Sequence, residues 1–142
     1  MPEIGAMRGF FGYSLSVDAS ALGVITDGTT YFFGLSGGSI WTTVSAIRKI
    51  FVPKSGTIKY INVFWHATTV GSSEEISVYL RLNDKTDYLI ATIGDANAAK
   101  NFVNSGLGIV VVQGDYLEIK IVCPTWVTNP ATIRVGGSVY IE

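Results

Sequence analysis

The chain has 142 residues and a formal net charge of −1, and 48% of its residues are apolar while only 15% are charged. A chain of this length is expected to form one domain that buries its own core. The near-neutral charge excludes the broad basic surface that nucleic-acid binding requires. Because soluble domains average about 25% charged residues, another chain is expected to cover part of this surface; a thicker core is the alternative.

Residues 1–28 combine five glycines with apolar side chains. This composition is too apolar for a solvated tail and too rich in glycine for an independent element. We expect the segment either to clasp a neighbouring subunit as an extended arm or to supply the first strands of the domain formed by residues 29–142. Glycines and Arg8 interrupt its apolar residues, so neither a signal peptide nor a membrane span is expected.

From about residue 43 onward, apolar residues repeat with a period of two, which predicts β-strands with one buried face. The clearest run is residues 76–83. Residues 116–121 repeat the pattern, with Glu118 and Lys120 expected on a charged, solvent-facing side. Further strands are predicted at residues 29–34, 44–52, 57–68, 88–93, 99–103, 107–112 and 132–141.

These strands recur about every ten residues without an intervening helix, a spacing typical of sandwiches and jelly rolls. The predicted fold class is therefore all-β, a jelly-roll sandwich of about eight to ten antiparallel strands with an extended N-terminal arm. Residues 53–56 predict a chain reversal, and residues 83–87 predict a hairpin loop. The hairpin loop lacks the ligand spacing of a calcium loop. Residues 95–100 are long enough for only a single helical turn.

The residues that carry catalysis are sparse. His66 is the single histidine, and its neighbours place it within a strand, with no serine elbow or paired nucleophile in the sequence. One histidine and one cysteine fall short of the three or four ligands of a zinc site, and Cys123 is expected to be buried. Glu74 and Glu75 are adjacent and would face opposite ways on a strand. We expect no enzyme, no metal and no cofactor.

Aromatic residues remain as candidates for recognition, since they bring large contact area at low entropic cost. They would stack on sugar rings or fill pockets on a protein partner; the alternative is that at least two of the tryptophans lie in the core or at a subunit contact. The strand at residues 57–68 is substantially apolar or aromatic on both faces, which indicates packing against a second sheet and against another subunit. The candidate subunit or partner contacts are Phe10, Phe11, Tyr13, Trp41, Tyr60, Phe64, Trp65, His66, Tyr79 and Trp126.

Four segments carry a resemblance: IFVPKSGTIK at residues 50–59, VYLRLNDKTDYLI at 78–90, VQGDYLEIK at 112–120 and GGSVYIE at 136–142. In this order they resemble small β-structured proteins encoded among the structural genes of tailed bacteriophages. More loosely, the turn at 53–56, the strand with LRLN at 80–83 and the strand with GDYLEI at 114–119 are in this order similar to the trimeric jelly rolls of the C1q and tumour-necrosis-factor type, which also occur at the tips of phage fibres.

The resemblance implies a structural virion protein, located on the capsid surface or on the tail or its fibres. We first expect a homotrimeric capsid decoration (cement) protein that bridges neighbouring coat subunits. Its partner would be the major capsid protein or another virion protein. The alternative is a tail-fibre tip that recognises host surface glycans. Neither the decoration protein nor the fibre tip is expected to have nucleic acid or a membrane as partner. The shared motifs are structural, so they bear on fold and assembly more than on a binding partner.

Overall fold

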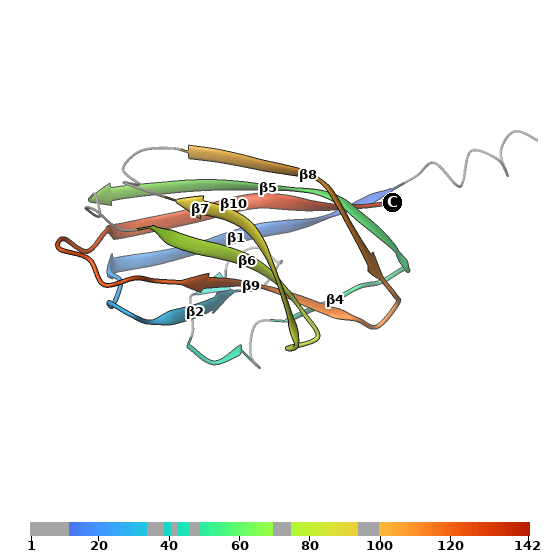
Figure 1. Ribbon diagram of the computed structural model, residues 1–142, viewed down its shortest axis with the longest axis horizontal. Helices are drawn as coiled ribbons and strands as arrows, with labels where there is room; N and C mark the ends of the chain where they lie inside the picture. The colour runs from blue at the N-terminus through green and yellow to red at the C-terminus, as the bar shows by residue number, and fades with distance from the viewer. Residues whose placement is uncertain (1–11, 34–38, 41–42, 46–48, 70–74, 94–99) are drawn as a thin grey trace, which may run out of the picture.

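The computed structural model describes residues 12–33, 39–40, 43–45, 49–69, 75–93 and 100–142. This part of the chain contains no helix, and its strands form two sheets packed face to face (Figure 1). The strands are β1 (Tyr13–Val24), β2 (Thr30–Phe33), β3 (Ser39–Ile40), β4 (Ile50–Phe51), β5 (Gly56–Thr69), β6 (Ile76–Leu82), β7 (Thr86–Ile93), β8 (Lys100–Val111), β9 (Tyr116–Val122) and β10 (Ala131–Ile141).

Sheet A has the strand order β3-β1-β10-β5-β8, and sheet B has the order β2-β9-β6-β7 with β4 also paired to β9. Apart from the two-residue strands β3 and β4, the strands pair as β1 with β10, β2 with β9, β5 with β8 and β6 with β7, all antiparallel. These are the pairs of one long antiparallel ribbon rolled up so that its halves face each other, which is a jelly roll. The predicted fold class is confirmed. The short pairing of β1 with β3 is parallel and departs from it.

The core lies between the sheets because alternate residues of each strand point inward. On β5, Ile61, Val63 and Trp65 are buried, whereas Tyr60 and Phe64 on the opposite side are each 40% exposed. This alternation follows the sequence pattern of residues 57–68. Inward side chains of sheet A meet those of sheet B, which include Phe33, Val78, Leu80, Leu117, Ile119 and Ile121.

Three predicted elements differ from the structure. The strands predicted at 99–103 and 107–112 belong to one strand, β8, because Gly106 and Gly108 adopt φ values of 77° and 61° and bend the strand without ending it. Of the strand predicted at 44–52, only Ile50–Phe51 pairs among the described residues. The helical turn considered at 95–100 lies outside the described residues except for Lys100, which begins β8.

Within the segment 1–28, Tyr13–Val24 forms β1, which pairs with β10 over most of its length in the interior of sheet A. Residues 1–11 lie outside the described residues. Figure 1 shows β1 running beside β10 across the full width of the sandwich. These twelve residues therefore serve as a strand of the domain itself.

The hairpin between β6 and β7 forms as the sequence predicts. Asn83 and Asp84 have φ values of 54° and 56°, and the Lys85 amide donates to the Leu82 carbonyl at 3.0 Å. Two consecutive residues with positive φ match the twist of the flanking strands, and Asn and Asp tolerate this conformation better than other residues with side chains. The turn carries Asp84 to the outer side of sheet B.

Candidate functional site

The structure buries two of the predicted contact residues. Trp65 is fully buried and Trp126 is 6% exposed, so both indole rings pack within this chain's core rather than against a partner. This follows the alternative considered for the tryptophans. Phe10, Phe11 and Trp41 lie outside the described residues.

Two more of these residues are half-buried and already have contacts within the chain. The Tyr13 hydroxyl donates to the carbonyl of Lys54, and its ring packs against the core. Tyr79 lies on the outer face of sheet B, where the ammonium group of Lys120 is 5.5 Å from its ring centroid. Both aromatic side chains therefore already contact other residues of the same chain.

The remaining predicted contacts, Tyr60, Phe64 and His66, share the outer face of sheet A. Tyr60 pairs with Tyr140 across β5 and β10, and their rings stack with centroids 4.9 Å apart and planes at 14°. On β8, Val110 lies opposite Thr57 of β5 and is 69% exposed. We call Tyr60, Tyr140 and Val110 the apolar patch.

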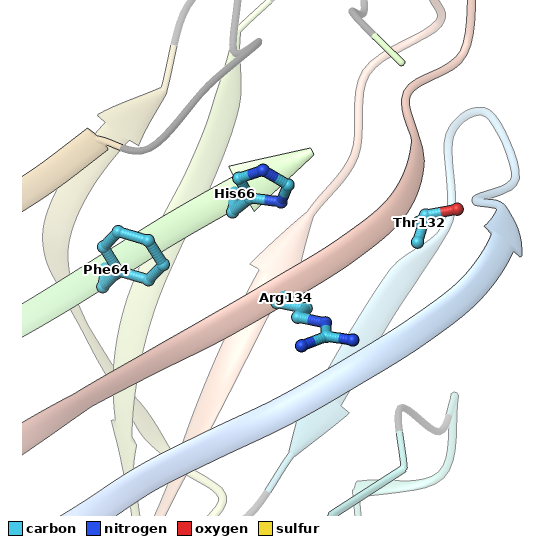
Figure 2. A pocket seen from close by; sticks show the side chains of 4 residues that line it. All are labelled: Phe64, His66, Thr132 and Arg134. Carbon is cyan, nitrogen blue, oxygen red and sulfur yellow. The ribbon is translucent and has the colours of Figure 1, made fainter. Parts of the chain in front are cut away.

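Farther along the same face, Phe64 and His66 of β5 and Thr132 and Arg134 of β10 line a half-open pocket of about 340 Å³. His66 and Arg134 are direct cross-strand partners. Figure 2 shows Phe64 and His66 over β5 and the Arg134 side chain reaching from β10 toward β1. Among the side chains that the structure describes, no carboxylate pairs with the Arg134 guanidinium group. The pocket thus offers a free cation beside an aromatic ring.

Thr132 forms one wall of this pocket in an unusual backbone conformation. Its φ is 51°, which is rare for a β-branched residue and costs about 1–2 kcal/mol. The register between β1 and β10 shifts at this position, between Ala21 and Val24. Strained residues of this kind gather at binding sites, where the surrounding structure holds them in place. Sequence reasoning missed Thr132 and Arg134 because only the β5–β10 register brings them beside Phe64 and His66.

A second cluster of functional groups lies on the outer face of sheet B. Glu118 was expected to face solvent, and that prediction is wrong: its side chain is 1% exposed. Its cross-strand partner is Arg81 of β6, whose Nε lies 3.9 Å from Oε1 of Glu118. From the segment between β3 and β4, Ser45 donates to Asp84 Oδ1 at 2.9 Å and Lys49 pairs with the same carboxylate. Side chains of that segment therefore cover the face of β9 that carries Glu118.

The two carboxyl groups of this cluster have opposite electrostatic environments. Burial raises the pKa of Glu118 to about 7, and the neighbouring Asp84 adds to the rise, against the opposing effects of Ser45 and Arg81. The hydrogen bond from Lys49 lowers the pKa of Asp84 below its usual range. Of these two carboxyl groups, Glu118 therefore holds a proton more readily, and Asp84 carries the negative charge.

Opposed pKa shifts in neighbouring carboxyl groups are also found in acid/base catalysts. A glycosidase needs its two carboxyl groups about 5–10 Å apart across an open cleft that admits substrate. Here Glu118 is buried, and Lys49 and Ser45 hold Asp84. The cluster ties the segment before β4 to sheet B and is better suited to stabilising the fold than to a reaction. No three His, Cys, Asp or Glu side chains among the described residues are grouped to hold a metal ion.

No protein-family model matches the chain, and no curated protein matches its sequence. In the part of the chain that the structure describes, no helix has the length and apolar character needed to cross a membrane.

Proposed function

We propose that the protein is a structural virion protein, a capsid decoration protein that assembles as a homotrimer and stabilises the particle surface. The observation that carries the proposal is that β5 carries exposed aromatic side chains on its outer face in addition to the apolar side chains of its inner face. Its inner face fills the core, while Tyr60 and Phe64 on the outer face are each 40% exposed. A strand with two apolar faces is typical of a sheet covered on both sides.

The composition of the outer face supports this proposal. From Tyr60 to Asn62 on β5, and opposite them from Ser138 to Tyr140 on β10, the outward positions carry no carboxylate and no ammonium group, and the exposed Lys59 borders them. The centre of a protein interface is typically depleted of charge and enriched in tyrosine and other aromatic residues. Covering such a face yields about 25 cal/mol for each Å² of apolar surface removed from water. A second copy of the chain is the occupant we propose for the apolar patch.

The test is to locate the protein in intact phage particles by cryo-electron microscopy, with mass spectrometry of the same particles to identify it. We expect density for three copies around a three-fold axis on the outer capsid surface, with the apolar patch turned toward that axis. Particles that lack the protein, or that carry it only at the tail, would contradict the decoration role.

A second candidate function, a fibre tip that recognises host glycans, is favoured by the pocket of Phe64, His66, Thr132 and Arg134. It combines an exposed ring with polar groups, the two kinds of contact that sugars use. Fluorescently labelled protein should then bind host cells and lose binding after periodate oxidation of surface glycans. Binding that survives oxidation would contradict a glycan receptor.

A further inference from the structure

We propose that the pocket lined by Phe64, His66, Thr132 and Arg134 binds a sugar that carries a carboxylate, with Arg134 receiving the carboxylate and Phe64 packing against the sugar ring. This inference rests on the second proposed function, glycan recognition, and names the class of glycan. It concerns a different part of sheet A from the apolar patch.

Arg134 is the reason to expect an acidic ligand. A guanidinium group offers paired N–H donors in a fixed plane that matches both oxygens of a carboxylate. Arg134 is exposed, and no described carboxylate occupies it. One cation on a chain of net charge −1 suits a single carboxylate, whereas a polyanion requires repeated phosphate contacts.

Phe64 and the size of the pocket indicate a sugar ring. The Phe64 ring is 40% exposed on the same face of the sheet and gives an apolar surface for the C–H face of a pyranose. About 340 Å³ lies at the lower end of the range for small-molecule sites and fits one or two sugar residues. The ligand would therefore lie across β5 and β10 and present its carboxylate toward β1, where Figure 2 shows the guanidinium group.

His66 and Thr132 supply groups for the sugar hydroxyls. The two ring nitrogens of an imidazole and the hydroxyl of a threonine can form hydrogen bonds with sugar hydroxyls. The positive φ of Thr132 fixes where its side chain stands in the wall of the pocket. His66 is held beside Arg134 by the β5–β10 register. The four side chains thus present one guanidinium group, one aromatic ring and two further polar groups within a single hollow.

The experiment is a titration of isotopically labelled protein, followed by amide chemical shifts, with three methyl glycosides: a glucuronide, a sialoside and the uncharged glucoside. We expect the glucuronide or the sialoside to shift amides of β5 and β10 around the pocket, and the stronger of the two identifies the source of the carboxylate. The glucoside should bind at least about tenfold more weakly, because it leaves Arg134 without its partner.

Two variants make the test specific. Arg134→Gln should lower affinity for the acidic sugar by about tenfold or more and leave the glucoside unchanged, whereas Lys59→Gln removes an exposed cation from β5 outside the pocket and should change neither. Dispersed amide spectra of both variants show that they fold. Equal binding of glucoside and acidic sugars, or no pocket shift with any of them, overturns the inference. Host-cell binding that persists in Arg134→Gln places glycan recognition elsewhere and leaves the second candidate function standing.

Discussion

Glu118 on β9 and Arg81 on β6 are cross-strand partners, yet Nε of Arg81 lies 3.9 Å from Oε1 of Glu118, beyond hydrogen-bond distance. Arg81 instead donates from Nη2 to the Asp84 carbonyl at 2.8 Å. The buried carboxyl group therefore gains little from the nearby cation, and burial decides its protonation. Glu118, which the sequence pattern places with Lys120 on a charged outer side, is therefore a buried carboxyl group in the fold.

This relationship gives the stability of the protein a pH dependence. The pKa of Glu118 is about 7 in the folded protein against an ordinary value of 4.5, so the folded state holds the proton more tightly than the unfolded state. The stabilisation is complete below about pH 4.5 and is lost as the pH rises through 7. The free energy of unfolding, measured with urea, should fall by up to about 3 kcal/mol over this range.

Glu118→Gln should remove that decline, because the amide stays neutral at every pH. The variant should be more stable than the wild type above about pH 7. Measurements kept above about pH 4.5 leave Asp84 ionised, since its lowered pKa affects stability only at lower pH. Glu75→Gln, at an exposed carboxyl group, is the control and should follow the wild-type curve. Parallel pH profiles for wild type and Glu118→Gln would show that Glu118 is not the responsible group.

Gly137 should be the glycine least tolerant of substitution in β10. Its φ is 148°, and a Cβ atom there would lie 1.9 Å from the carbonyl oxygen of Asn62 on β5. Gly137→Ala should therefore push β5 and β10 apart and lower the free energy of unfolding by about 3 kcal/mol or more. Gly28→Ala is the control, because Gly28 also has positive φ but faces open space, and it should lose about 1 kcal/mol. If both variants lost the same free energy of unfolding in thermal or urea unfolding, Gly137 would not lie this close to the Asn62 carbonyl oxygen.

Cys123 should be inert toward thiol reagents while the protein is folded. Its side chain is 3% exposed, and burial raises the pKa of the thiol to about 12, so the reactive thiolate is scarce. Labelling with a chromogenic disulfide should be negligible in buffer and complete in urea. As a reference, Val127→Cys in a Cys123→Ala background places a thiol at a position that is 85% exposed in the wild type and should react at once. Rapid labelling of native wild type would contradict the burial.

The apolar patch is expected to hold the subunits together. Val110→Lys places a charge at a site that would lose water on assembly, so this variant should remain folded and dissociate to monomers. Leu89→Lys is the matched control: Leu89 is 52% exposed but belongs to β7 of sheet B, and its substitution should leave the assembly intact. Sedimentation velocity of both variants distinguishes the two faces. Dissociation by Leu89→Lys alone would move the contact to sheet B.

Much of the fold could be predicted from the sequence because burial on one face imposes alternation on each strand. The run 76–83 matches β6, and residues 57–68 match β5 with Tyr60 and Phe64 outward. Alternation does not show what covers the outer face, which is why Glu118 was placed in solvent. A glycine can also either end a strand or bend it. Gly106 is typical of a strand end in the sequence, but in the structure it forms a bend inside β8.

The candidate site was only half predictable. Phe64 and His66 stand out in the sequence because aromatic residues on an outward strand face are unusual. Thr132 and Arg134 follow 66 to 70 residues later, and only the β5–β10 register sets Arg134 beside His66. The positive φ of Thr132 depends on a register shift against β1, which no local sequence pattern signals. Long-range strand pairing is therefore the information that the sequence pattern lacked.

Assembly is the central claim, and the mass of the purified protein in solution tests it most directly. Multi-angle light scattering at micromolar concentration should give three times the 15.3 kDa of the single chain. A uniform mass of 15.3 kDa over the accessible concentration range would contradict the trimer and leave the apolar patch without its proposed occupant.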